Sequence, residues 1–121
     1  MNGNFLDEIK LKLRQFADER DWSQFHSPKN LCMALAGETG ELLEHFQWLT
    51  EDESGNLSDE KLVEVGEEIA DIFIYLVRLS DRLNVDLAGA VKDKIRKNEK
   101  KYPAEKVKGS SKKYTEYKTI N

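Results

Sequence analysis

Apolar residues recur every three or four positions through the first hundred residues, which is the period of an amphipathic helix. The first such stretch predicts a helix over residues 4–20 that ends before Asp21-Trp22. Its apolar positions are Phe5, Ile9, Leu13 and Phe16. No alternation typical of strands, no internal repeat and no low-complexity segment is left in the chain. The fold class expected is therefore all-α.

A second helix is predicted over residues 28–49. Ser27 can accept a hydrogen bond as its N-cap, and Pro28 suits the first helical position because its fixed φ is helical. The polar segment 50–56 then predicts a turn, so the next helix should run back beside this one.

A third helix is predicted over residues 59–83, with Ser58 as its N-cap. Asn84-Val85-Asp86 interrupts it, and Asp86 can cap a fourth helix over residues 87–101. Tyr102-Pro103 ends that helix, because the residue before a proline is biased away from helical conformation. The expected organisation is four to five helices whose hairpins assemble into an oligomeric bundle.

Charge divides the chain unequally. Residues 1–91 carry 8 Lys or Arg against 19 Asp or Glu, whereas residues 92–121 carry 11 against 4. We expect a helical domain over residues 1–103 and a basic tail over 104–121. A body this acidic would repel phosphate backbones, so nucleic acid is not an expected partner.

The chain has 121 residues and one cysteine, Cys32. This length predicts a single domain small enough that a helical hairpin needs neighbours, and oligomerisation is expected. No apolar segment is long enough to cross a membrane, and no basic start leads into an apolar run. A lone cysteine excludes an intrachain disulfide and suits a reducing compartment, so the cytoplasm is expected.

An aspartate interrupts the apolar run that ends at Val77. Asp71 is flanked by Ile69, Ala70, Ile72, Phe73 and Ile74. A carboxylate held among such neighbours requires a partner, because an unpaired buried charge is strongly unfavourable. A cation bound by several carboxylates would supply that partner, and an ion pair with Arg78 or Arg82 is the alternative.

Two pairs of carboxylates share the same spacing. Glu38 and Glu41 lie at i and i+3 of the second helix, and Glu68 and Asp71 repeat this in the third. In an antiparallel hairpin with 1.5 Å rise per residue, both pairs lie roughly 10 to 18 Å from the turn, at one level. Oxygen ligands without histidine or cysteine suit Mg²⁺, with Mn²⁺ as a second choice.

Two glycines accompany the first pair. Gly37 and Gly40 each cost the helix about 1 kcal/mol relative to alanine. They therefore indicate either close backbone packing or open access beside Glu38 and Glu41.

Two other classes of protein gather helical carboxylates or amphipathic helices. A di-iron bundle uses Glu-x-x-His pairs, and neither His26 nor His45 has a glutamate three residues before it. A non-catalytic interaction module explains the amphipathic helices but leaves Asp71 and the glycines in the helix without a role.

Several segments together resemble a known family, the MazG-like all-α nucleoside triphosphate pyrophosphohydrolases, and within it the dCTP pyrophosphatase branch. The resemblance covers roughly residues 5–115. It is carried by Glu38-x-x-Glu41 with Glu68-x-x-Asp71, by ERDWSQFH at 19–26, GETGEL at 37–42, FQW at 46–48 and DIFIYL at 71–76, and by the late KYP and GSSKKY.

The resemblance implies hydrolysis of a deoxynucleoside triphosphate, dCTP or a modified dCTP, to the monophosphate and pyrophosphate. By the same resemblance Glu38, Glu41, Glu68 and Asp71 hold Mg²⁺, and Glu38 orients or deprotonates the attacking water. It also implies a homo-oligomer, either a homodimer or a dimer of dimers, which is a homotetramer.

Substrate contacts follow from the same resemblance. Aromatic faces stack on nucleobases, and a histidine can contact base or phosphate. The residues assigned to the substrate are Trp22, His26, Trp48, Tyr75, Lys94, Asn98 and Tyr102, with Lys112 and Lys113 of the tail as further candidates. This sequence has Leu13 where the dCTP pyrophosphatase branch can carry a histidine.

Overall fold

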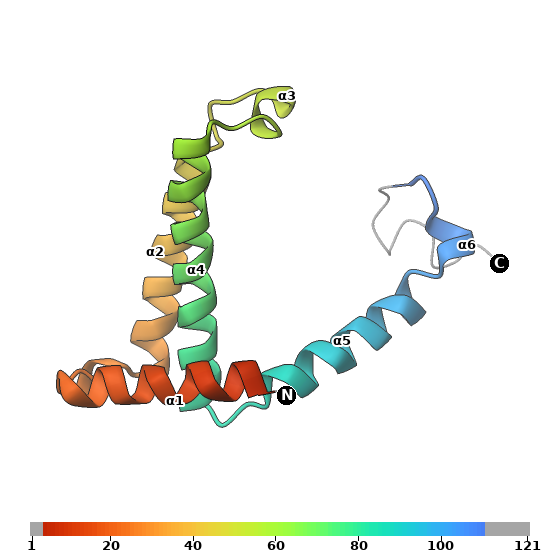
Figure 1. The fold of residues 1–121 in the computed structure, drawn as a ribbon. Coiled ribbons are helices and arrows are strands. Elements are labelled where there is room, and N and C mark those ends of the chain that lie inside the picture. The colour runs from red at the N-terminus through yellow and green to blue at the C-terminus, as the bar shows by residue number, and fades with distance from the viewer. Residues whose placement is uncertain (1–3, 111–121) are drawn as a thin grey trace. The chain divides into compact units, whose positions relative to one another are not determined.

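The computed structural model describes residues 4–110, and every regular element in that range is a helix (Figure 1). The elements are α1 (Asn4–Glu19), a 3₁₀ turn η1 (Ser23–Phe25), α2 (Pro28–Glu44), α3 (Glu51–Ser54), α4 (Asp59–Arg82), α5 (Leu87–Lys101) and α6 (Ala104–Val107). The chain divides into two compact units, residues 1–85 and 86–121, each of which is described by itself. The all-α prediction is confirmed for the described range.

The three predicted N-caps are confirmed. Each capping side chain accepts a hydrogen bond from the backbone N–H three residues later, which satisfies one of the free donors of the first turn. The bonds run from Asn30 N to Ser27 Oγ (3.1 Å), from Lys61 N to Ser58 Oγ (3.2 Å) and from Gly89 N to Asp86 Oδ1 (3.1 Å).

Two residues with left-handed backbone mark the predicted helix breaks. Asp21 has φ 53° and Asn84 has φ 57°. Aspartate and asparagine tolerate this conformation better than most residues, and it closes a helix by turning the next N–H back onto the last carbonyls. Trp22 N donates to Ala17 O at 2.8 Å, and Val85 N donates to Ser80 O at 2.8 Å.

The second helix and the following turn differ from the prediction. α2 ends at Glu44 rather than near residue 49, and the segment predicted as a polar turn contains α3. Thr50 and Glu53 form a capping box that starts this new helix, with Glu53 N donating to Thr50 Oγ1 at 3.1 Å and Thr50 N to Glu53 Oε1 at 2.9 Å. The Thr-x-x-Glu signature was present in the sequence and favours a helix start here.

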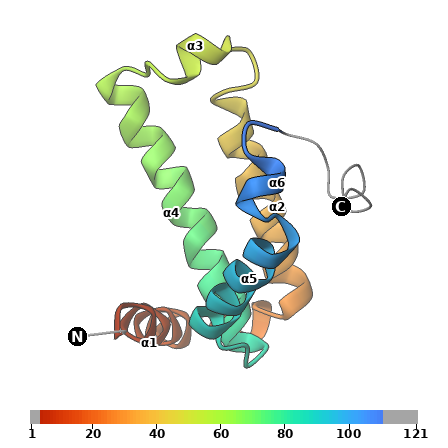
Figure 2. The same ribbon diagram turned by 90° about the vertical axis from the view of Figure 1, so that its right-hand side faces the viewer.

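Within residues 4–85, α2 and α4 run antiparallel and α1 crosses α4 at the end of the hairpin opposite α3 (Figures 1 and 2). The apolar core of the described chain is small. Its buried members are Ala17, Leu31, Val65 and Val77. Phe5 and Phe73 stack with ring centroids 6.1 Å apart, which adds a contact between α1 and α4. A hairpin with so little buried apolar surface presents further apolar side chains to its surroundings.

The second unit holds α5 and the short α6. The expected end of α5 at Lys101 is confirmed, and α6 begins directly after Pro103. The predicted domain boundary at residue 103 stays a prediction, since the described units divide after Val85. Among the described helices, none combines the length and the apolar character that a membrane span requires.

Candidate metal centre and adjoining pocket

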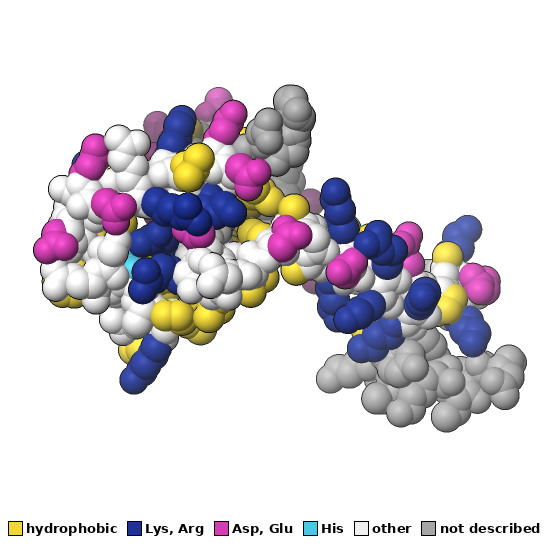
Figure 3. All heavy atoms as spheres, turned by 90° about the horizontal axis from the view of Figure 1, so that it is seen from below, with side chains coloured by type: hydrophobic (Ala, Val, Ile, Leu, Met, Phe, Trp, Pro, Cys, Tyr) yellow, Lys and Arg dark blue, Asp and Glu magenta, His cyan; other side chains and the backbone are white. Residues whose placement is uncertain are grey.

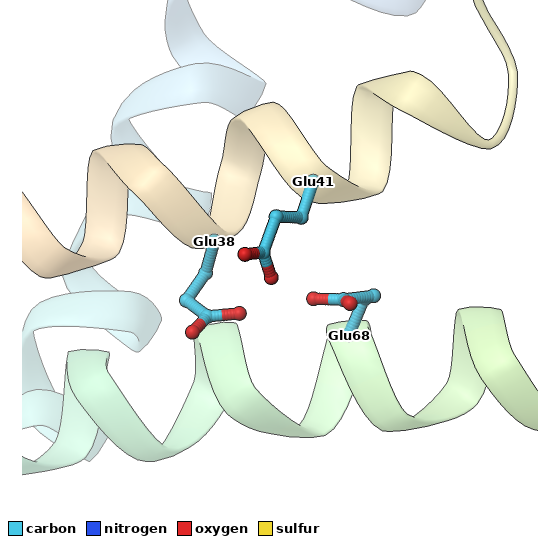
Figure 4. Close-up of side chains that lie close together, drawn as sticks. All are labelled: Glu38, Glu41 and Glu68. Carbon is cyan, nitrogen blue, oxygen red and sulfur yellow. The ribbon is translucent and has the colours of Figure 1, made fainter.

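Three glutamates from the two long helices converge. Glu38 and Glu41 point from α2, and Glu68 from α4, toward a shared space (Figure 4). One carboxylate oxygen from each lies within 4.8 Å of the other two. The antiparallel hairpin therefore brings the two carboxylate motifs to one level, as the helical rise predicts.

The cluster lacks a counter-charge within the described chain. Glu38 Oε2 and Glu68 Oε2 are buried, and no group in residues 4–110 donates a hydrogen bond to either. Burial raises the pKa of Glu38 to about 7, and the neighbouring carboxyl groups of Glu68, Glu41 and Asp71 raise it further. Unpaired buried oxygens and carboxylate-only ligands fit a hard divalent cation such as Mg²⁺.

Asp71 requires a correction. The sequence placed it inside a core, but its side chain is exposed, and its apolar neighbours Ile69 and Ile74 are 54% and 37% exposed. The apolar run that flanks it lies largely on the surface of this chain, so the run did not indicate burial. Asp71 is outside the three-glutamate cluster, although its charge acts on Glu38.

The alternative partners of Asp71 have other contacts. Arg78 forms an ion pair with Asp81, Nη1 to Oδ2 at 3.6 Å, and Arg82 donates from Nε to the backbone oxygen of His26 at 3.1 Å. Neither arginine pairs with Asp71 in the part of the chain that the structure describes.

Gly37 and Gly40 face open space. A Cβ built on either glycine meets no described atom within 4 Å. Close packing inside the described chain therefore does not account for the two glycines, and open access beside Glu38 and Glu41 is compatible with the structure.

A pocket of about 370 Å³ adjoins the carboxylates. Its lining is mostly apolar and aromatic, with two carboxylates and one arginine. The lining residues are Leu13, Phe16, Trp22, His26, Leu31, Glu38, Asp71, Ile74, Tyr75 and Arg78. An aromatic pocket with a few polar groups is typical of a small-molecule site, and this volume lies near the lower end of the usual range. Glu38 belongs both to this pocket and to the carboxylate cluster.

Three of the residues predicted to contact substrate line this pocket: Trp22, His26 and Tyr75. Trp22 meets Phe16 edge to face at 5.7 Å between ring centroids, which fixes one wall. Burial raises the pKa of Tyr75, and the charges of Glu38, Asp71 and Glu41 raise it further. Tyr75 therefore keeps its phenolic proton at neutral pH and can donate a hydrogen bond.

Sequence reasoning missed Arg78 as a pocket residue. It is only 6% exposed, and it donates from Nε to His26 Nδ1 at 3.2 Å and from Nη2 to Ser23 Oγ at 3.3 Å. Its place two helical turns beyond Asp71 on α4 was the available signal, since residues seven apart share a helix face. Figure 3 shows Lys and Arg side chains gathered around a histidine on the face of residues 4–85 seen from below.

The other residues predicted to contact substrate are not among those that line this pocket. Trp48 follows α2 in the turn toward α3, is 86% exposed and does not line the pocket. Lys94 and Asn98 lie one turn apart on α5, and Tyr102 N donates to Asn98 O at 2.8 Å. These three belong to the second unit, and their substrate contacts stay predictions. Lys112 and Lys113 lie outside the described residues.

An all-α hairpin that carries a carboxylate cluster beside an aromatic pocket forms a site that could hold a metal ion next to a small molecule. The chain matches the MazG-like family over residues 34–117, and it belongs to that family.

Curated relatives agree with this placement. The chain is 48% identical to human dCTP pyrophosphatase 1 over 113 residues, which are 92% of this chain and 66% of that protein. It is 44% identical to the mouse protein of the same name, over the same shares of each chain. The chain thus spans just under two thirds of the length of these relatives.

A solved structure shares the fold. The crystal structure of a pyrophosphatase from Archaeoglobus fulgidus is similar to this chain with a TM-score of 0.79 and 42% sequence identity. The match covers 85% of this chain and 96% of the archaeal chain.

Proposed function

We propose that this protein is a nucleoside triphosphate pyrophosphohydrolase. It hydrolyses a (deoxy)nucleoside triphosphate, dCTP or a modified dCTP, to the monophosphate and pyrophosphate, and so cleans the nucleotide pool. The observation that carries this proposal is the position of Glu38, which belongs both to the carboxylate cluster and to the aromatic pocket. The names of the relatives, dCTP pyrophosphatase 1 and pyrophosphatase, support the reaction and the base.

Glu38, Glu41 and Glu68 would hold Mg²⁺, or Mn²⁺ in its place, with Asp71 as a fourth ligand from the pocket side. When bound, a divalent ion offsets the charge that develops on the phosphate oxygens and polarises the phosphorus centre. Burial among other carboxylates raises the pKa of Glu38 to about 7 in the absence of metal, and a bound cation would favour its ionised form. As a carboxylate it would orient the attacking water and take its proton.

The pocket would hold the nucleoside. Trp22 offers an exposed ring face, and stacking on a base contributes roughly 1 to 3 kcal/mol. Tyr75 lines the pocket and feels the charge of Glu38, Asp71 and Glu41, and it would face the sugar and disfavour a 2′-hydroxyl by crowding. Lys94, Asn98 and Tyr102 of the second unit are proposed to contact the triphosphate.

A product assay tests this function. Purified protein with Mg²⁺ is incubated with each common dNTP and NTP, and the products are resolved by phosphorus NMR. Pyrophosphate with the nucleoside monophosphate is expected, with dCTP among the best substrates. Orthophosphate with the nucleoside diphosphate would reject cleavage between the α and β phosphates.

The non-catalytic interaction module is separated from the enzyme by metal titration. If the three glutamates form a metal site, the metal-free protein should bind Mg²⁺ or Mn²⁺ specifically. Calorimetry on metal-free protein measures this binding. A chain that binds neither ion and turns over no nucleotide would favour the interaction module.

A homo-oligomer, a dimer or a dimer of dimers, is part of the proposal. Large apolar side chains on α2 and α4 are exposed in the single chain: Met33 (63%), Leu43 (57%), Leu62 (53%), Val63 (63%) and Ile69 (54%). A second copy would cover this surface, and Trp48 would be available to contact it. Light scattering on purified protein measures the state directly. The cytoplasmic location, expected from the single cysteine, stays a prediction.

A further inference from the structure

Two arginines of α4 fasten the connection between α1 and α2. Arg78 donates from Nε to His26 Nδ1 at 3.2 Å and from Nη2 to Ser23 Oγ at 3.3 Å. Arg82 donates from Nε to the backbone oxygen of His26 at 3.1 Å. These three bonds join residues 23–26 to a helix more than fifty residues away in the sequence.

Apolar packing contributes little to this attachment. Among the described elements η1 packs chiefly on α1, and none of its residues is buried. Phe25, the largest apolar side chain of η1, is 58% exposed. The position of η1 against α4 therefore depends on the hydrogen bonds from the arginines, because few buried contacts hold it.

Both ends of the attachment are themselves held. Arg78 is 6% exposed and pairs with Asp81 at 3.6 Å. Ser23 Oγ donates to Asp18 Oδ1 at 2.8 Å, so the hydroxyl that accepts from Arg78 is oriented by α1. Trp22 comes directly before Ser23 and lines the pocket. Whatever fixes Ser23 therefore also restrains the wall that Trp22 forms.

One of the three bonds depends on the protonation of a histidine. An arginine nitrogen can only donate, so His26 Nδ1 must accept and carries no proton. A protonated imidazole has an N–H on both nitrogens, so it accepts no hydrogen bond and places a second positive charge beside Arg78. Burial lowers the pKa of His26, and the charges of Arg78 and Arg82 lower it further. Proton uptake by His26 therefore breaks the bond from Arg78.

The charged groups of the neighbouring elements oppose a protonated His26 in the attached arrangement. Arg78 and Arg82 of α4 supply positive charge. The acidic groups around the histidine are Asp18 of α1, Asp81 of α4, and the pocket carboxylates Glu38 of α2 and Asp71 of α4. Asp18 and Asp81 already bind other partners, and no carboxylate in the described chain forms an ion pair with His26. A proton on His26 thus favours release of residues 23–26.

We propose that Arg78 and Arg82 are positioning residues for the pocket: they hold residues 23–26 against α4, and this attachment opens when His26 takes up a proton. The attached arrangement keeps Trp22 in the pocket wall. The released arrangement binds one proton more than the attached one, so lower pH favours release. Release should therefore grow as the pH falls below 6.5, the ordinary pKa of histidine.

Tryptophan fluorescence tests this release without any nucleotide. The chain has two tryptophans, so Trp48→Phe leaves Trp22 as the only one. Quenching of Trp22 by acrylamide should rise by up to about twofold as the pH falls below 6.5, since 44% of its surface is already exposed. Helical circular dichroism should stay constant over the same range. A flat quenching profile would overturn the proposal.

Three variants in the Trp48→Phe background identify the group that titrates. His26→Asn keeps an oxygen that accepts from Arg78 but takes up no proton, so quenching should stay low at every pH. His45→Asn is the matched control, because it removes the other histidine of the chain and should keep the rise. Glu38→Gln should keep it too. A rise that persists in His26→Asn, or disappears in either of the other variants, would overturn the proposal.

NMR of the wild-type protein decides the question if His26→Asn fails to fold. The chain has two histidines, and His45→Asn assigns their ring signals. The His26 signal should titrate with a midpoint below 6.5, and the indole N–H of Trp22 should shift with the same midpoint. Different midpoints for the two signals would overturn the coupling between His26 and the wall.

The consequence for catalysis rests on the proposed function. Arg78→Met removes both bonds from Arg78, so Trp22 should be quenched more strongly already at pH 8, and KM for the best nucleotide should rise several-fold with a smaller change in kcat. Unchanged quenching and KM in this variant would overturn the positioning role of Arg78. Absence of turnover on every nucleotide would reject the proposed function, whereas the fluorescence and NMR results would still decide whether His26 controls the attachment.

Discussion

Arg14 of α1 and Asp81 of α4 form a two-point ion pair, with Nε to Oδ2 at 2.7 Å and Nη2 to Oδ1 at 2.6 Å. Asp81 also forms an ion pair with Arg78, so one carboxylate pairs with two arginines. Its side chain is 7% exposed, whereas that of Arg14 is 48% exposed. Asp81 therefore ties the first helix to the longest one and holds the buried Arg78 in place.

Asp81→Asn should lower the free energy of unfolding at pH 7 by about 2 kcal/mol, because the charge-assisted bonds are weakened and Arg78 loses its ion-pair partner. The bond from Arg14 and the nearby positive charges lower the pKa of Asp81. For a carboxylate whose pKa is depressed on folding, the stabilisation is present above its unfolded pKa of 3.8 and is lost as pH falls through the folded value. Urea unfolding of both proteins at pH 7 and pH 3 should show the difference shrinking at the lower pH.

Glu41→Gln and Glu68→Gln should each reduce Mg²⁺-dependent turnover by at least about 100-fold, since even outer-shell partners of metal sites often cost 10- to 100-fold. Helical circular dichroism should be unchanged, because both residues lie on long helices that pack through other side chains. Glu64→Gln is the control: it removes a carboxylate of α4 that pairs with Lys61 at the surface. Near-wild-type activity in either cluster variant would rule out the proposed metal site.

The raised pKa of Glu38 makes the stability of the metal-free protein depend on pH. Between its unfolded pKa of 4.5 and its folded pKa of about 7, the folded state holds a proton that the unfolded chain has released. The free energy of unfolding should therefore fall as pH rises across this window. Melting curves of the metal-free protein test this, and in Glu38→Gln the fall should be smaller. Added Mg²⁺ should raise the melting temperature most near pH 8, where Glu38 is already ionised.

Asp71→Asn separates a metal ligand from a structural charge. The exposed Asp71 carboxylate has no ion-pair partner in the described chain and repels Glu38, so the variant should be at least as stable as the wild type in chelator. It should gain less from Mg²⁺ and lose most of its turnover. A marked drop in melting temperature in chelator would show instead that Asp71 has a structural partner, and its role as a ligand would then be wrong.

The starts of α2, α4 and α5 could be predicted because their signals are local. Ser27, Ser58 and Asp86 cap helices through atoms three residues away, and a cap needs no information from the rest of the chain. The carboxylate cluster was predictable for a similar reason, since the rise of a helix fixes the level of Glu38 and Glu68 once the hairpin is assumed.

Burial was less predictable, because it depends on what covers each face. The apolar neighbours of Asp71 look like core in the sequence, yet in the single chain several of them face outward. Arg78 shows the converse. Its pairing with Asp81, three residues on along the helix, is local. Nothing in its local sequence indicates Ser23 and His26, because these partners come from a segment more than fifty residues away.

The residue before Arg14 in the chain, Leu13, lines the pocket. Arg14 itself does not line the pocket, and its bond to Asp81 holds α1 against α4. The wall that a substrate meets is thus positioned by a bond that the substrate never touches. Exchanges at Arg14 or Asp81 would therefore change the support of this wall while every side chain that lines the pocket stays the same.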